Sequence, residues 1–269
     1  MRFARLTLFL ALCGGLGCAE QTTPKPSPSA RAAAPKQAKA EQAERRADDE
    51  EEVLELVETN QVLAAQKLAS ESGVDGIALV RLEGILNHAV RDADAALDPL
   101  QRAVADDPDD AHVGLRLAEV YCWKHEAQQA RPLIEATSVE RLKELERPWE
   151  ELRRAARVWG CLEEFERGFS MLEAVEQVPD VPARELLATR VQRAELSAWQ
   201  KDFESAGRIV DAVLVEVPGH VGASLVKGQL LEWQGRYKEA LATYRAAFRL
   251  HPGEPAVRDR LLALEWVKK

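Results

Sequence analysis

The chain has 269 residues, 46% of them hydrophobic, and a formal net charge of −9 at pH 7. This acidic balance argues against a nucleic-acid binder, because phosphates require a clustered basic surface. The apolar run near the start is too short for a membrane span of about 20 residues, and four cysteines are too few for a disulfide-stapled scaffold.

Residues 1–17 are expected to be a secretory signal peptide. A short basic start is followed by the apolar run Leu6–Leu12 and then by small residues. Cys18 comes directly after Gly17 and resembles the lipidated cysteine of bacterial lipoproteins, although Gly15 stands where that family usually has leucine. Two outcomes stay open: lipidation of Cys18, or ordinary cleavage after Ala19. The first implies an outer-membrane lipoprotein facing the periplasm, and the second a soluble periplasmic or secreted protein.

Residues 18–48 are expected to be a disordered tether. The segment is rich in proline, alanine and lysine and has hardly any large apolar residue. It therefore cannot bury enough surface to offset the entropy of ordering, and it would hold the next domain away from the membrane. The acidic run Asp48–Glu52 marks the start of a helix, and we expect residues 49–76 to form a degenerate first helical pair.

From residue 77 to residue 254 the sequence repeats with a period of about 34 residues. Five units begin at Ile77, Ala111, Trp149, Leu187 and Val221. The eighth residue of each unit is small: Gly84, Ala118, Ala156, Ala194 and Gly228. The twentieth is also small: Ala96, Ala130, Gly168, Ala206 and Ala240. The twenty-fourth is apolar: Leu100, Ile134, Leu172, Val210 and Tyr244.

Each unit is expected to form two helices, because small residues at places 8 and 20 let two helix axes approach closely. One pair cannot cover its own apolar face, so neighbouring pairs must stack into an all-α solenoid without a sheet. The second and third units contain extra residues, near 137–148 and 178–186. We expect the second helix of the second unit to run on, or to break before Pro148.

The last unit carries the residues that are most typical of a known family: Gly228, Trp233, Gly235, Tyr237, Ala240, Tyr244, Ala247 and Pro252. It resembles the tetratricopeptide repeat family, and the resemblance extends over residues 77–254. It implies about five helical hairpins, with residues 49–76 as a candidate sixth. It also implies a protein that binds partners in a groove lined by the first helix of each unit.

Residues 255–269 are expected to form a capping helix, since the end of a solenoid must cover its last apolar face. Val257, Leu261, Leu262 and Leu264 are predicted to face the last repeat.

The sequence shows no pattern typical of catalysis, cofactor binding or a metal site. Its five histidines stand singly, and we expect each at the surface or in the groove. A nucleophile elbow, a phosphate-binding loop and a Cys-x-x-Cys pair are all absent. We therefore expect neither an enzyme nor a cofactor.

Cys122 and Cys161 fall at places 12 and 13 of adjacent units, on neighbouring first helices. A disulfide and two free, half-buried thiols both remain open. Adjacent helix axes about 8–10 Å apart exceed the usual Cα separation of a cystine, which favours free thiols.

In the resembled family, ligands lie at places 2, 5, 9, 12 and 13 of the first helices. Place 13 holds Trp123, Trp199 and Trp233, which would form a broken row with Arg153 and Arg157 in the gap left by Cys161. Tryptophan is enriched at binding hot spots, but the same indoles would also suit packing between first helices.

Place 9 alternates in charge, with Glu119 and Glu195 on either side of Arg157. The first interpretation is a ladder of salt bridges between repeats, which stabilises little if it is exposed. The second is an anionic peptide or C-terminal carboxylate bound by the arginines as forked donors.

The function that these patterns favour is an envelope-anchored, non-catalytic adaptor for protein partners, one that assists assembly of outer-membrane or surface structures such as pili, secretins or barrels. The alternative is a peptidoglycan- or polysaccharide-associated protein whose groove tryptophans stack on sugar rings. The sequence does not name the partner.

Overall fold

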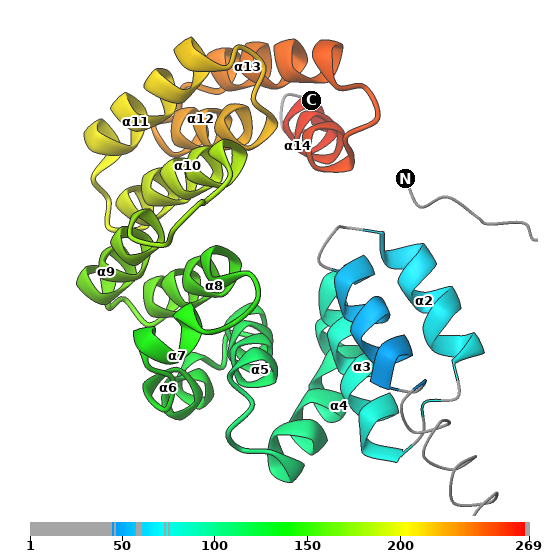
Figure 1. The fold of residues 1–269 in the computed structure, drawn as a ribbon. Helices are drawn as coiled ribbons and strands as arrows, with labels where there is room; N and C mark the ends of the chain where they lie inside the picture. The colour runs from blue at the N-terminus through cyan, green and yellow to red at the C-terminus, as the bar shows by residue number, and fades with distance from the viewer. Residues whose placement is uncertain (1–44, 46, 58–60, 73, 75, 267–269) are drawn as a thin grey trace, which may run out of the picture. The chain divides into compact units, whose positions relative to one another are not determined.

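The computed structural model describes residues 45, 47–57, 61–72, 74 and 76–266 (Figure 1). The described helices from residue 47 onward belong to one compact unit. The predicted signal peptide, the predicted lipidation site at Cys18 and the predicted tether up to residue 44 lie outside the described residues. Residues 45, 47 and 48, which the sequence places in the disordered tether, are helical, so the tether prediction is wrong at its end. Within the described residues all regular structure is helical, which confirms the all-α prediction.

Five antiparallel helix pairs follow one another in the order that the repeat period predicts. They are α3 (Gly76–Ala89) with α4 (Ala93–Asp106), α5 (Ala111–Trp123) with α6 (Ala127–Glu135), α8 (Pro148–Cys161) with α9 (Phe165–Glu176), α10 (Ala183–Trp199) with α11 (Phe203–Glu216), and α12 (Val221–Trp233) with α13 (Tyr237–Leu250). Consecutive first helices also pack on one another: α3 on α5, α5 on α8, α8 on α10 and α10 on α12. Equivalent places of successive repeats therefore lie side by side.

The small and apolar places of the repeat form the core. All residues at places 8, 20 and 24 are buried. At Gly228 an added Cβ would overlap the ring of Tyr244 and lie 2.8 Å from its hydroxyl oxygen. At Gly84 it would lie 2.9 Å from the Leu100 side chain. These glycines are therefore required by the close approach of the two helices in a pair.

Place 15, the turn between the two helices of a pair, adopts the left-handed conformation in all five repeats. The residues are Arg91, His125, Glu163, Lys201 and Gly235, with φ of 59°, 61°, 61°, 70° and 73°. Four of the five are not glycine, although this conformation costs such residues about 1–2 kcal/mol. The backbone thus repeats more regularly than the sequence does at this place.

The extra residues of the second unit form an additional short helix. The second helix, α6, ends at Glu135, and α7 (Val139–Lys143) follows with Ser138 as its N-cap. α8 then begins at Pro148, where proline is tolerated because the first turn lacks amide partners. In the third unit the extra residues lengthen the next first helix, so that α10 has 17 residues.

The two ends of the array also pack on repeats. Residues 47–57 are helical, α2 (Val62–Glu71) follows, and Val53 and Ala65 share a buried cluster with Leu82 of α3. At the other end, α14 (Pro255–Trp266) packs on α12 and α13. Val257 and Leu264 are buried, whereas Leu262 is 48% exposed, so the prediction that Leu262 faces the last repeat is wrong. Its place lies about 100° around the helix from that of Leu261.

Candidate partner-binding groove

The C-terminal turns of α5, α8 and α10 surround a pocket of about 340 Å³, which we call the apolar pocket. It is lined by the place-13 residues of three successive repeats, Trp123, Cys161 and Trp199, and by Arg157 and Phe165 among others. An added Cβ at Gly160, which also lines the pocket, would overlap Cδ2 of Leu196 and lie 2.9 Å from Cε3 of Trp199. A glycine is therefore needed here for Leu196 and the Trp199 indole of α10 to lie against α8. Trp199 remains 41% exposed.

A second pocket of about 270 Å³, the basic pocket, adjoins the first. Its lining includes His88, Arg91, Arg154, Glu119 and Arg157. The two pockets share Glu119, Trp123 and Arg157 as a common wall. The two pockets together form the groove, which is lined mainly by residues of the first helices α3, α5, α8 and α10.

The back wall of the apolar pocket contains a disulfide between Cys122 and Cys161, so the sequence-based preference for free thiols is wrong. The helix-axis argument failed because it used an average spacing. At this point the Cα atoms of the two cysteines are only 6.1 Å apart, within the range that a cystine spans. The bond ties α5 directly to α8.

Arg157 stands at the centre of the groove and is 36% exposed at its side chain. Its Nε donates to Glu119 Oε1 at 2.7 Å, and its Nη1 donates to Gln192 Oε1 at 3.2 Å. Trp123 lies on the same wall, stacked on the His88 ring with centroids 4.8 Å apart, and the Arg91 guanidinium lies 5.8 Å from the Trp123 ring centroid.

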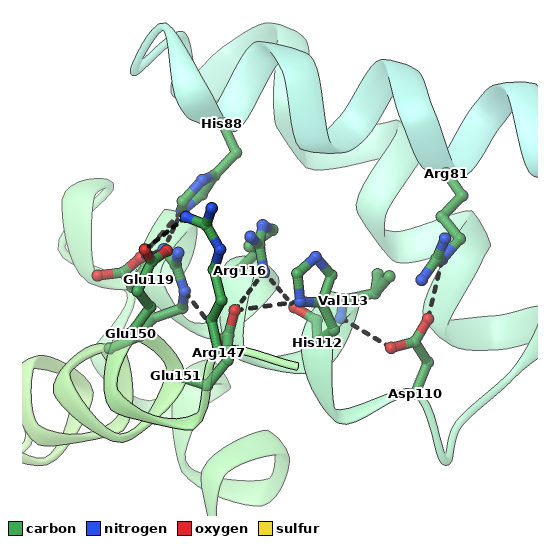
Figure 2. Close-up of polar contacts among 11 residues, drawn as sticks. Arg81, His88, Asp110, His112, Val113, Arg116, Glu119, Arg147, Glu150 and Glu151 are labelled. Atoms are coloured by element: carbon green, nitrogen blue, oxygen red, sulfur yellow. Dashed lines mark hydrogen bonds and ion pairs between the residues drawn. The ribbon is translucent and has the colours of Figure 1, made fainter. Parts of the chain in front are cut away.

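Behind the groove lies a buried network of charges that joins three repeats (Figure 2). Glu119 accepts from Arg154 and from His88 Nε2, the latter at 3.0 Å. Glu151 pairs with Arg154 at 3.1 Å and with Arg116 at 3.0 Å. Figure 2 shows His88 and Glu119 at one end of the network and Arg116 and Glu151 further along it. Because each carboxylate meets two arginines, removal of one partner leaves an uncompensated buried charge, which is a strongly destabilising change.

The network fixes the charge state of its members. Burial alone would raise the pKa of Glu119, but Arg157 and Arg154 hold that pKa well below its usual value. Glu151 behaves in the same way beside Arg116 and Arg154. Burial lowers the pKa of His88 to about 4, so the ring is neutral at pH 7 and donates from Nε2 to the Glu119 carboxylate.

A second histidine, His112, belongs to the same network. Its Nδ1 lies 3.0 Å from Glu151 Oε1, and burial lowers its pKa. His112 is 13% exposed at its side chain, lines a further pocket beside the network, and takes part in the ion pairing, a position that the sequence did not suggest.

The structure brings four of the seven predicted groove residues together: Glu119, Trp123, Arg157 and Trp199. Arg153 instead donates with both terminal nitrogens to Glu185, at 3.2 Å to the carbonyl oxygen and 2.8 Å to Oε2, and it lines neither pocket. Glu195 is half-buried and lines neither pocket, and burial raises the pKa of its carboxyl group despite Arg157 and Arg91. Trp233 is 52% exposed and contacts Phe203, with centroids 6.1 Å apart.

Sequence reasoning missed Arg91, Arg116, Glu151 and His88 as parts of this site. A signal was present on one face of two first helices: opposite charges stand three residues apart at Arg116 and Glu119 in the second unit and at Glu151 and Arg154 in the third. Arg91 gave no such signal, since it occupies a turn. Among the described residues no group of three or more ligands that could hold a metal ion is found. The described helices include none long and apolar enough to cross a membrane.

Comparison with known proteins supports the repeat assignment. The tetratricopeptide repeat family model matches residues 221–264. A search of curated proteins found no match. A tetratricopeptide repeat protein from Parabacteroides merdae is similar in structure with a TM-score of 0.56, at 11% identity, over 82% of this chain and 84% of that one.

Two further solved structures show the same fold. A thermophilic protein of this repeat class from Thermus thermophilus has a TM-score of 0.53 at 20% identity, over 71% of this chain and 100% of its own. PilW, described as a widely conserved type IV pilus biogenesis factor, has a TM-score of 0.53 at 11% identity, over 80% and 98%. Residues 221–264 therefore match the tetratricopeptide repeat family, and the fold of the chain is that of tetratricopeptide repeat solenoids.

Proposed function

We propose that this chain is a non-catalytic adaptor that binds a protein partner in the groove. The observation that carries the proposal is the apolar pocket, where two indoles and a half-exposed arginine converge from three repeats. Tryptophan and arginine are the residues that most often dominate binding energy at protein interfaces. The groove is also braced by a disulfide and by the charge network behind it. Binding a partner should therefore cost little conformational entropy of the groove residues.

The proposal includes export and anchoring: residues 1–17 direct secretion, Cys18 carries lipid, and the segment between Cys18 and the first helix forms a tether to the outer membrane. The Cys122–Cys161 disulfide supports this location, because such bonds persist mainly in oxidising compartments. Cys18→Ser should move the protein from the membrane fraction to the soluble fraction or block its processing. Retention of the variant on membranes washed with high salt would exclude a lipid anchor.

Within the envelope, we propose that the adaptor assists the assembly of outer-membrane or surface structures such as pili, secretins or barrels. The similarity to PilW is a similarity of fold. It motivates this narrower proposal without assigning the partner.

The adaptor role is tested by recovering partners with a tagged full-length chain after crosslinking in native cells. Trp199→Ala and Arg157→Glu should each reduce the recovery of the same protein. Trp233→Ala and Arg102→Glu are the matched controls, because Trp233 occupies the same place in a repeat outside the two pockets and Arg102 is exposed on α4. Circular dichroism of each variant establishes that the fold is kept. Equal recovery with all four folded variants would contradict the proposal.

The glycan alternative is decided with the same variants in a retention experiment. Exposed indoles also stack on sugar rings, and that stacking does not require the positive charge of Arg157. Retention of purified chain on peptidoglycan or polysaccharide, lost with Trp199→Ala and unaffected by Arg157→Glu, would favour the alternative over the adaptor.

A further inference from the structure

The two pockets of the groove differ in chemistry. The basic pocket is lined by four arginines and two glutamates, in a chain whose net charge is −9. The apolar pocket is lined by Trp123, Val158, the Cys122–Cys161 disulfide, Phe165 and Trp199 around the single arginine Arg157.

Two of the four arginines in the basic pocket are already committed to protein carboxylates. Arg154 is buried between Glu119 and Glu151, and Arg116 is buried on Glu151. Neither has exposed donors to offer, since their side chains are 12% and 3% exposed. The other two arginines, Arg157 and Arg91, keep guanidinium donors that no carboxylate among the described residues uses.

Arg157 uses Nε and Nη1 for Glu119 and Gln192, and its Nη2 makes no hydrogen bond to the described residues. Arg91 is exposed, and within the described part of the chain it forms no ion pair with a carboxylate; its guanidinium lies near the Trp123 ring instead. Guanidinium groups carry five donors and match a carboxylate in a forked geometry. Both arginines line the basic pocket and present donors for an anion.

Glu119, Trp123 and Arg157 line both pockets and form the wall between them. An extended peptide that crosses this wall therefore occupies both pockets. We propose that the groove binds an extended segment of the partner in which an acidic side chain lies near a large apolar side chain. The carboxylate pairs with Arg91 and Arg157 in the basic pocket. The apolar side chain packs between Trp123 and Trp199 against the disulfide. This inference rests on the proposed adaptor function and adds the chemistry of the bound segment.

The test uses short peptides, acetylated and amidated at their ends, in which one glutamate precedes one phenylalanine with none to three alanines between them. Each is compared with the same peptide carrying glutamine in place of glutamate. Binding to the full-length chain is measured by isothermal titration. At one spacing the glutamate peptide should bind about ten-fold more tightly than its glutamine counterpart, as expected when a charge-assisted pair is lost.

Arg91→Gln and Arg157→Gln should each remove most of this ten-fold difference, and Arg102→Gln should leave it unchanged. Arg91→Gln is the safer of the two variants for folding, since Arg91 is exposed and forms no part of the buried network. The inference is overturned if no glutamate peptide outbinds its glutamine counterpart. It is equally overturned if a peptide with a free C-terminal carboxylate and no glutamate binds best. If partner recovery still depends on Trp199 in either case, the adaptor function stands and only the ligand chemistry is wrong.

Discussion

At the scale of single residues, glycine has two opposite roles in this chain. At Gly228 the helix partner is so close that an added Cβ would overlap the Tyr244 ring. At Gly207, inside α11, an added Cβ meets nothing within 4 Å. The same substitution should therefore change stability in opposite directions at the two sites.

We predict that Gly228→Ala lowers the free energy of unfolding by about 1–2 kcal/mol, because overpacking outweighs the higher helix propensity of alanine. Gly207→Ala should raise it by about 0.5–1 kcal/mol through propensity alone. Urea denaturation of both variants measures the difference. A stabilised Gly228→Ala variant would show that α12 and α13 do not approach as closely as the fold requires.

His88 makes the stability of the protein depend on pH. Its pKa is about 4 in the folded chain and about 6.5 when unfolded, and the groups facing it are Glu119 and Arg116 of α5 and Arg154 of α8. Between these values the unfolded chain binds the proton and the folded chain does not. Falling pH therefore favours unfolding, and the stability contributed above about pH 6.5 is lost progressively toward pH 4.

The expected loss from His88 between pH 6.5 and pH 4 is up to about 3 kcal/mol of unfolding free energy. His88→Gln should flatten the pH profile in this interval, because glutamine does not titrate and its amide can still donate to Glu119. His125→Gln, at an exposed turn residue, is the control and should keep the steeper profile. Identical slopes for the His88 variant and the original chain would refute the assignment.

At the scale of helices, the groove depends on how α5 and α8 are joined. The Cys122–Cys161 disulfide links residues 39 apart in sequence, across two successive repeats. Closing a loop of this length reduces the entropy of the unfolded chain and stabilises the fold by about 4 kcal/mol in the chain-entropy account.

We predict that Cys122→Ser combined with Cys161→Ser lowers the free energy of unfolding by about 2–4 kcal/mol. Adding a reductant should lower the stability of the original chain to that of the double variant and leave the variant unchanged. Thiol labelling under denaturing conditions gives an independent check, since both cysteines should react only after reduction. If both react without reduction, the helices are not bonded in the protein.

The helices and their order were predictable from the sequence because the period is carried by core places. Gly84, Ala118 and Ala156 mark the close approach of paired helices, and every repeat has glycine or alanine at this place. The short helix α7 was not predictable, because the extra residues of the second unit show no core pattern of their own. The disulfide was missed because an average helix spacing hides a local approach of 6.1 Å.

The site was predictable only in part. Trp123, Arg157 and Trp199 could be found because equivalent places of stacked repeats lie side by side. Arg153 shares the same face, yet the extra residues that lengthen α10 bring Glu185 within reach of it. Which arginine is neutralised depends on such neighbours, and a periodic pattern does not contain that information.

At the scale of the whole molecule, the repeats contact mainly their neighbours in sequence, as in other solenoids. Specific function must then come from the residues that depart from the repeat. Those departures concentrate at the junction of α5, α8 and α10, where the disulfide, the charge network and both pockets occur. This concentration is the basis for assigning partner binding to the groove rather than to the outer helices.

The central claim is tested most directly by site-specific photocrosslinking in native cells. The photoreactive residue p-benzoyl-phenylalanine is placed at Trp199 in the groove or at Val215, which is 83% exposed on α11 and lines neither pocket. The account predicts that one partner protein is crosslinked from position 199 and not from position 215. Crosslinking of that partner from position 215, with none from position 199, would place the binding surface on the outer helices and contradict the account.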